Sequence, residues 1–222
     1  VLVGRMGADD TLELADLAEE YGSGEVRISQ RQNVMITDVA EEDLDDLLDE
    51  PLLEDYSPDP HPFMRGSIAC TGTEFCSLSI VETKNRQVRY ARWLKENVEL
   101  PDGVEDFHIH LSGCTASCAQ PQIADISLRG MKTRKDGEAV EALDIGVGGG
   151  LGENPHFADW VGQRVPADEV PGVIENLLAT FEDARARRPS ASSSPATTRR
   201  PSKSSSSPRR RATRTPTCTT RR

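Results

Sequence analysis

Four of the five cysteines fall into two close pairs, and this spacing is the strongest chemical signal in the 222-residue sequence. Five residues separate Cys70 from Cys76, three separate Cys114 from Cys118, and 37 lie between the pairs. Four thiolates on two glycine-containing loops can surround an iron–sulfur cluster, because soft sulfur donors suit iron. Structural zinc usually has spacings of about two to four residues. The spacing therefore favours a cluster, and zinc or unligated buried thiols are the alternatives.

Composition places these cysteines in an acidic body with a basic tail. Residues 1–183 contain 14 basic and 37 acidic side chains, a net charge of −23, whereas residues 184–222 contain 12 basic and no acidic ones. An acidic body argues against binding to nucleic acid or to an acidic membrane surface. A secreted disulfide domain would be smaller and richer in cysteine. Clustered cysteines in a chain of this size indicate metal or redox chemistry in the cytoplasm.

No apolar run approaches the ~18 residues that a membrane-spanning helix needs, and no leader peptide is visible. The chain begins at Val1 inside an apolar stretch, "VLVG", that is typical of a strand. These features predict a fragment of a longer chain.

The elements around the cysteines read as an α+β protein. Residues 1–56 predict a small unit: a strand at 1–4, a helix at 10–21, two strands around "QRQ", and a helix at 41–48. A proline-rich linker, "SPDPHPF", begins after this unit.

Residues 66–183 predict a second unit that contains both cysteine pairs. A helix is expected over 76–98, strands over 106–113, 123–130 and 141–150, and a closing helix over 165–184. From Ala184 onward the sequence has no Val, Leu, Ile, Phe or Met. It cannot bury a core and is expected to be disordered. Its composition is also typical of a GC-rich coding region that is read out of frame.

Two stretches carry a family resemblance. "ACTGTEFCSLSIVETK" and "HLSGCTASCAQPQIADISLRG" resemble the cluster-and-sirohaem motif of ferredoxin-type nitrite and sulfite reductases, and "YGSGEVRISQRQNVMITDV" resembles a strand pair of their second ferredoxin-like half-domain. The resemblance implies the C-terminal half of such a reductase. It divides the chain into a ferredoxin-like half-domain (1–56), a linker (57–65), a sirohaem- and [4Fe–4S]-binding domain (66–183), and a disordered basic tail (184–222).

The resemblance also implies roles for the four cysteines. Cys70, Cys76, Cys114 and Cys118 would ligate a [4Fe–4S] cluster, and Cys118 would bridge it to the sirohaem iron. Electrons from ferredoxin would reduce nitrite to ammonia, a six-electron step of nitrogen assimilation. "CTGTEFC" followed by "VETK" resembles the nitrite branch more than the sulfite branch, so sulfite reduction is the alternative. Similar enzymes usually carry Pro and Asn where this chain has Thr115 and Ala116, so an Asn side chain whose hydrogen bonds can tune the reduction potential is absent here.

Several polar residues could touch the cofactors. Arg27 and Asn33 are candidates for cofactor contact. Sirohaem carries many carboxylates, and arginine pairs with carboxylates. Positions on a solvent-facing hairpin explain them equally well, and Arg31 is expected at the surface. Lys84 could face the cofactor, although a lysine on a helix is more often solvated.

His108 and His110 alternate on a predicted strand and so share one face, where a packed or hydrogen-bonded pair is favoured over a metal site. The glycines of "GVGGGLG" suit either close approach to a macrocycle or a tight turn.

Two other functions compete with the reductase. One is an electron-transfer module that holds only the cluster. The other is nucleic-acid binding through the tail, which lacks aromatic residues for base stacking. The first half of similar enzymes supplies cations that grip the substrate oxyanion, so this chain alone is expected to be inactive.

Overall fold

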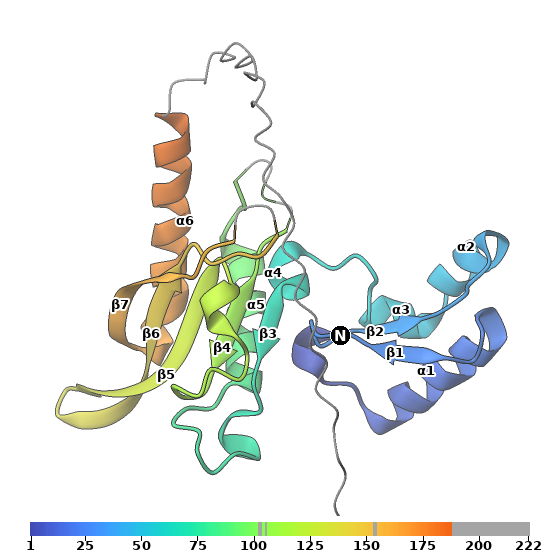
Figure 1. Ribbon diagram of the computed structural model, residues 1–222, viewed down its shortest axis with the longest axis horizontal. Helices are drawn as coiled ribbons and strands as arrows, with labels where there is room; N and C mark the ends of the chain where they lie inside the picture. The colour runs from blue at the N-terminus through green and yellow to red at the C-terminus, as the bar shows by residue number, and fades with distance from the viewer. Residues whose placement is uncertain (102–103, 105, 153–154, 188–222) are drawn as a thin grey trace, which may run out of the picture. The chain divides into compact units, whose positions relative to one another are not determined.

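The computed structural model describes residues 1–101, 104, 106–152 and 155–187, which form helices and two β-sheets (Figure 1). Their buried apolar side chains form two clusters. The helices and strands of this part confirm the predicted α+β class. The predicted tail, 184–222, lies outside the described residues from position 188 onward. Its first residues belong to the last helix, α6 (Val170–Ala186).

The smaller cluster belongs to the first segment. This first segment, residues 1–56, comprises α1 (Ala8–Tyr21), the antiparallel pair β1 (Val26–Ile28) and β2 (Val34–Ile36), the 3-10 turn η2 (Glu41–Asp43), α2 (Leu44–Leu48) and α3 (Pro51–Asp55). Leu14 and Leu17 recur at helical spacing on α1 and pack against Leu47 and Leu52. The helix α1, the strand pair and the helix α2 confirm four elements predicted for this segment, whereas α3 was not predicted.

The predicted strand at 1–4 is wrong. Leu2–Gly4 forms a 3-10 turn, η1, because Val3 and Gly4 adopt positive φ values of 50° and 67° that a strand cannot contain. Val3 is fully buried in the larger core. An apolar run of this length therefore marked a buried turn rather than a strand.

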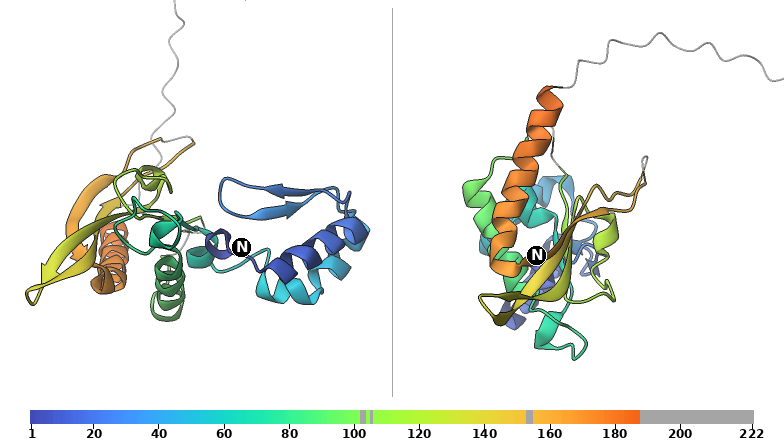
Figure 2. Two further views of the ribbon diagram at one scale, coloured as in Figure 1. Left: turned by 90° about the horizontal axis from the view of Figure 1, so that it is seen from below. Right: turned by 90° about the vertical axis from the view of Figure 1, so that its left-hand side faces the viewer.

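The larger sheet has five strands in the order β3-β4-β5-β6-β7. They are β3 (Ser67–Ala69), β4 (Ile109–Ser112), β5 (Ile126–Lys135), β6 (Glu138–Val147) and β7 (Asp159–Pro166). β4 pairs in parallel with both β3 and β5, whereas β6 pairs antiparallel with both β5 and β7. The helices α5 (Lys84–Asn97) and α6 cover one face of this sheet (Figure 2).

The core lies between that face and the two helices. Leu94 on α5 and Ile174 on α6 are fully buried against Leu111, Leu128 and Ile145 of the sheet. Short turns join the elements: η3 (Gly72–Glu74), η4 (Pro121–Ile123) and η5 (Ala167–Glu169), and the four-residue helix α4 (Pro62–Arg65) lies in the predicted linker. Among the described residues, no helix is long and apolar enough to cross a membrane.

Strands β4, β5 and β6 and helix α6 confirm four predicted elements, whereas β3 and β7 were not predicted. The helix predicted over 76–98 is wrong in its first eight residues, because α5 begins at Lys84. The backbone N–H groups of Ile80 and Val81 donate to the carbonyl of Gly113, at 2.8 and 3.3 Å, instead of to helical partners. A contact between distant loops thus overrides the local helical pattern.

Candidate metal centre

The two cysteine-bearing loops leave the same end of two neighbouring strands. β3 and β4 pair in parallel, with Ala69 opposite Leu111. Cys70 directly follows β3, and Cys114 follows β4 after Gly113. Because both chains run the same way, their loops begin side by side at one edge of the sheet. The topology therefore brings together two pairs that lie 37 residues apart.

A direct contact joins the loops at Cys70. The Gly113 N–H donates a hydrogen bond to Cys70 Sγ at 3.1 Å. An added Cβ on Gly113 would lie 2.0 Å from Ser79 Oγ, so a side chain does not fit where the loops meet. A hydrogen bond to sulfur favours the thiolate and tunes the reduction potential of a bound cluster.

The first loop closes around Thr83. This fully buried residue donates from Oγ1 to the Cys70 carbonyl at 2.6 Å. Gly72 adopts a φ of 71°, and an added Cβ there would lie 2.4 Å from the same hydroxyl oxygen. The Cys76 N–H donates to the Gly72 carbonyl at 3.0 Å, which fixes the backbone before the second thiol. Thr83, which the sequence did not single out, thus anchors the Cys70–Cys76 loop.

The second loop is held by side chains of β4. Ser112 Oγ accepts from the Ala119 N–H at 3.0 Å, and His110 Nδ1 lies 3.1 Å from the Gln120 carbonyl oxygen. The rings of His108 and His110 meet edge to face, with centroids 6.0 Å apart. These contacts confirm the interpretation of the two histidines as a packed, hydrogen-bonded pair.

The thiols suit a cluster by type but are not gathered around a common point. All four are free; Cys70, Cys76 and Cys114 are partly exposed and Cys118 is exposed. In the described part of the chain, no three His, Cys, Asp or Glu side chains lie close enough to hold a metal ion. Adjacent loops with four thiolate donors fit an iron–sulfur cluster chemically. Ligation by this set stays a prediction, and assembly would have to draw the four side chains inward.

Arg27 and Asn33 have local partners. Arg27 Nε lies 2.9 Å from Glu25 Oε1, and Asn33 Oδ1 accepts from the Val1 amino group at 2.8 Å. Cofactor contact by either residue stays a prediction. Arg31 lies 3.5 Å from Asp106 and is more than half exposed, which confirms its expected surface position.

Lys84 is not a solvated helix residue. Its Nζ donates to the Val3 carbonyl, and burial lowers its pKa below the usual value. Gly149 lies against a distant backbone segment, because its N–H donates to the Ala124 carbonyl at 3.0 Å. An added Cβ at Gly149 would lie 2.6 Å from that oxygen. Both interpretations of the glycine-rich stretch, the macrocycle contact and the tight turn, stay predictions.

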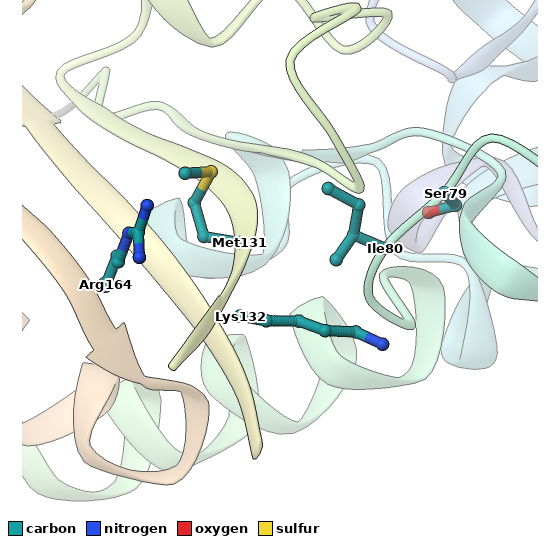
Figure 3. Close-up of a pocket in the computed structure, with 5 residues that line it drawn as sticks. All are labelled: Ser79, Ile80, Met131, Lys132 and Arg164. Carbon is teal, nitrogen blue, oxygen red and sulfur yellow. The ribbon is translucent and has the colours of Figure 1, made fainter. Parts of the chain in front are cut away.

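A pocket of about 530 Å³ opens beside the first cysteine loop (Figure 3). Its lining residues are Ser79, Ile80, Met131, Lys132 and Arg164. Neither cation forms an ion pair within the described ranges. Two unneutralised cations around an apolar floor can attract an anionic group, and Ser79 lies three residues after Cys76.

Comparison with known proteins places both segments in one family. Residues 1–53 match the nitrite/sulfite reductase ferredoxin-like half domain. Residues 61–192 match the nitrite and sulphite reductase 4Fe-4S domain.

Individual relatives agree with these matches. The chain is 60% identical to the assimilatory ferredoxin-dependent nitrite reductase of Haloferax mediterranei, over 82% of this chain and 31% of that protein. It is 43% identical to the ferredoxin–nitrite reductase of Synechococcus elongatus, over 84% of this chain and 36% of that protein. The structure of Mycobacterium tuberculosis NirA matches with a TM-score of 0.75 and 28% identity, over 86% of this chain and 35% of NirA. The chain spans about a third of these relatives and belongs to the family of the nitrite and sulphite reductase 4Fe-4S domain.

Proposed function

We propose that this chain is the cluster-bearing part of a ferredoxin-dependent nitrite reductase, which reduces nitrite to ammonia with six electrons. The observation that carries the proposal is the pair of cysteine loops at one edge of β3 and β4, with the Gly113 N–H on Cys70 Sγ. The relatives at 60% and 43% identity are both named as ferredoxin-dependent nitrite reductases.

Membership of this family implies two cofactors, a [4Fe–4S] cluster and sirohaem. Cys70, Cys76, Cys114 and Cys118 would hold the cluster, and Cys118 would be shared with the sirohaem iron. When bound, the two cofactors store electrons and pass them to the substrate. The chain's own part is to orient the thiolates: Thr83 fixes the Cys70 backbone, and the Gly113 N–H stabilises negative charge on its sulfur.

We propose the domain bounds, two further cofactor-binding residues and the location of the protein on the same family resemblance. Residues 1–56 would form the ferredoxin-like half-domain, 57–65 the linker and 66–183 the cofactor-binding domain. Arg27 and Asn33 would contact sirohaem carboxylates if they exchange their present partners for the cofactor. The protein would work in the cytoplasm, where a reducing environment keeps the four free thiols available for iron.

Anaerobic reconstitution of the chain with iron and sulfide tests the proposal. We expect about four iron atoms per chain and the absorption of a [4Fe–4S] centre. Replacing any of the four paired cysteines with serine should lower iron retention, whereas Cys218→Ser is the matched control outside the pairs. A chain that takes up no cluster, or that prefers a single zinc ion, would contradict the proposal.

Two further measurements separate the alternatives. Sirohaem added to the reconstituted chain together with the remainder of the enzyme should give a macrocycle spectrum, which a cluster-only module would not show. Turnover of nitrite and sulfite by that complete enzyme should favour nitrite. Faster turnover of sulfite would assign the chain to the sulfite branch.

A further inference from the structure

The strand β4 presents two polar side chains to the loop that follows Cys118. Side chains alternate across a strand, so Ile109 and Leu111 enter the core while His110 and Ser112 share the opposite face. His110 is 6% exposed and Ser112 is 1% exposed. Both are therefore buried polar groups, and His110 Nδ1 and Ser112 Oγ have partners within the protein, whereas His110 Nε2 has none among the described residues.

Those partners are consecutive backbone groups. Ser112 Oγ accepts from the Ala119 N–H at 3.0 Å, and His110 Nδ1 lies 3.1 Å from the Gln120 carbonyl oxygen. A carbonyl can only accept, so Nδ1 must carry the proton. Burial lowers the pKa of His110, which keeps the ring neutral at physiological pH. Two side chains of one strand thus hold the two residues after Cys118.

This loop needs such support. Ser117 and Gln120, on either side of Cys118, have left-handed φ values of 60° and 52° although neither is glycine. Such conformations persist only where the surroundings hold them. Cys118 itself is exposed, and in the described part of the chain its thiol makes no hydrogen bond. The backbone on either side of Cys118 therefore decides where its sulfur lies.

We infer that His110 and Ser112 are positioning residues, which hold the Ala119–Gln120 backbone so that Cys118 meets the cluster in one geometry. This inference rests on the proposed function, since it assumes that Cys118 is a cluster ligand. A ligand that shifts changes its overlap with iron and thereby the reduction potential of the cluster. Loss of either side chain should therefore alter the potential without removing a thiolate.

The test compares Ser112→Ala with Ser67→Ala. Ser67 is the matched control, because it is a buried strand serine with hydrogen bonds to Phe63 and Gln87, at the opposite end of β3 from Cys70. Hydrogen exchange of the cofactor-free chain reports the Ala119 amide directly. We expect about tenfold faster exchange of this amide in Ser112→Ala and no change in Ser67→Ala.

Redox titration of the reconstituted chain supplies the second readout. We expect Ser112→Ala to keep its iron content and to shift the ratio of reduced to oxidised cluster about tenfold at a fixed potential, or about 59 mV for one electron. His110→Leu, which removes the donor, should shift the potential similarly. His110→Asn retains a donor near the position of Nδ1 and should restore most of the parental value.

The outcomes separate the two proposals. Unchanged exchange at Ala119 in Ser112→Ala would refute the hydrogen bond, and faster exchange with an unchanged potential would refute the positioning role. In both cases the proposed function would stand if the parent chain takes up a cluster. A parent chain that takes up none would refute the proposed function and this inference together.

Discussion

The side-chain amide of Gln32 pairs with both backbone polar groups of Ala69, the residue before Cys70. Gln32 Nε2 donates to the Ala69 carbonyl at 2.8 Å, and Gln32 Oε1 accepts from the Ala69 N–H at 3.2 Å. β3 is an edge strand, so these groups point away from β4 and would otherwise lack a partner strand. Gln32 therefore joins the first segment to the strand that leads into the cysteine loop.

Removing this amide should destabilise the chain. In Gln32→Ala two part-buried backbone groups lose their partners, which we expect to cost about 1–3 kcal/mol of unfolding free energy. Urea denaturation measures the change, and Gln30→Ala is the control because Gln30 is an exposed glutamine two positions away. Equal midpoints for the two variants would show that the pairing contributes nothing to stability.

Gly113→Ala should perturb the meeting point of the two loops. The new Cβ would lie 2.0 Å from Ser79 Oγ, so the loops must separate, and we expect a loss of about 1–3 kcal/mol together with weaker cluster retention. Adding Ser79→Gly should recover part of both losses. Gly172→Ala is the control, since no heavy atom lies within 4 Å of its added Cβ. If Gly113→Ala behaves like Gly172→Ala, the close approach is not present in solution.

Acid should destabilise the cofactor-free chain through His110. Burial lowers its folded pKa below the unfolded value of 6.5, so the unfolded state binds the proton first as the pH falls. Above the unfolded pKa the ring is neutral in both states, so this destabilisation is absent. Below it, stability falls by at most about 1.4 kcal/mol per pH unit until the folded pKa is reached. Nearby His108 opposes protonation of the ring and Asp125 favours it.

The comparison of the parent with His110→Asn isolates this contribution. Urea denaturation at about pH 7.5 and about pH 5 should show a smaller acid-induced loss in the variant, which has no titrating ring at this position. The same loss in both chains would assign the acid sensitivity to other groups.

Cys118→Ser should alter the sirohaem spectrum of the complete enzyme directly. Serine offers a hard oxygen where a shared thiolate would join the cluster to the sirohaem iron, and both irons should bind it more weakly. Cys70→Ser should act on the macrocycle only through damage to the cluster, and Cys218→Ser should change neither cofactor. If Cys118→Ser leaves the sirohaem spectrum and the coupling to the cluster intact, another cysteine is the bridge.

The sequence by itself determined the kind of chemistry and much of the secondary structure. Thiol type and spacing predicted the two loops, and local apolar periodicity predicted α1, α6 and the strands β4 to β6, because these signals are contained in short stretches. Only the tertiary structure decided how the loops are held. The backbone of 76–83 leaves the helical pattern to bond Gly113, and Gln32, Thr83 and Ser112 gain their roles from partners 37, 13 and 7 residues away. Contacts of this kind depend on which strands become neighbours, and no local pattern records that choice.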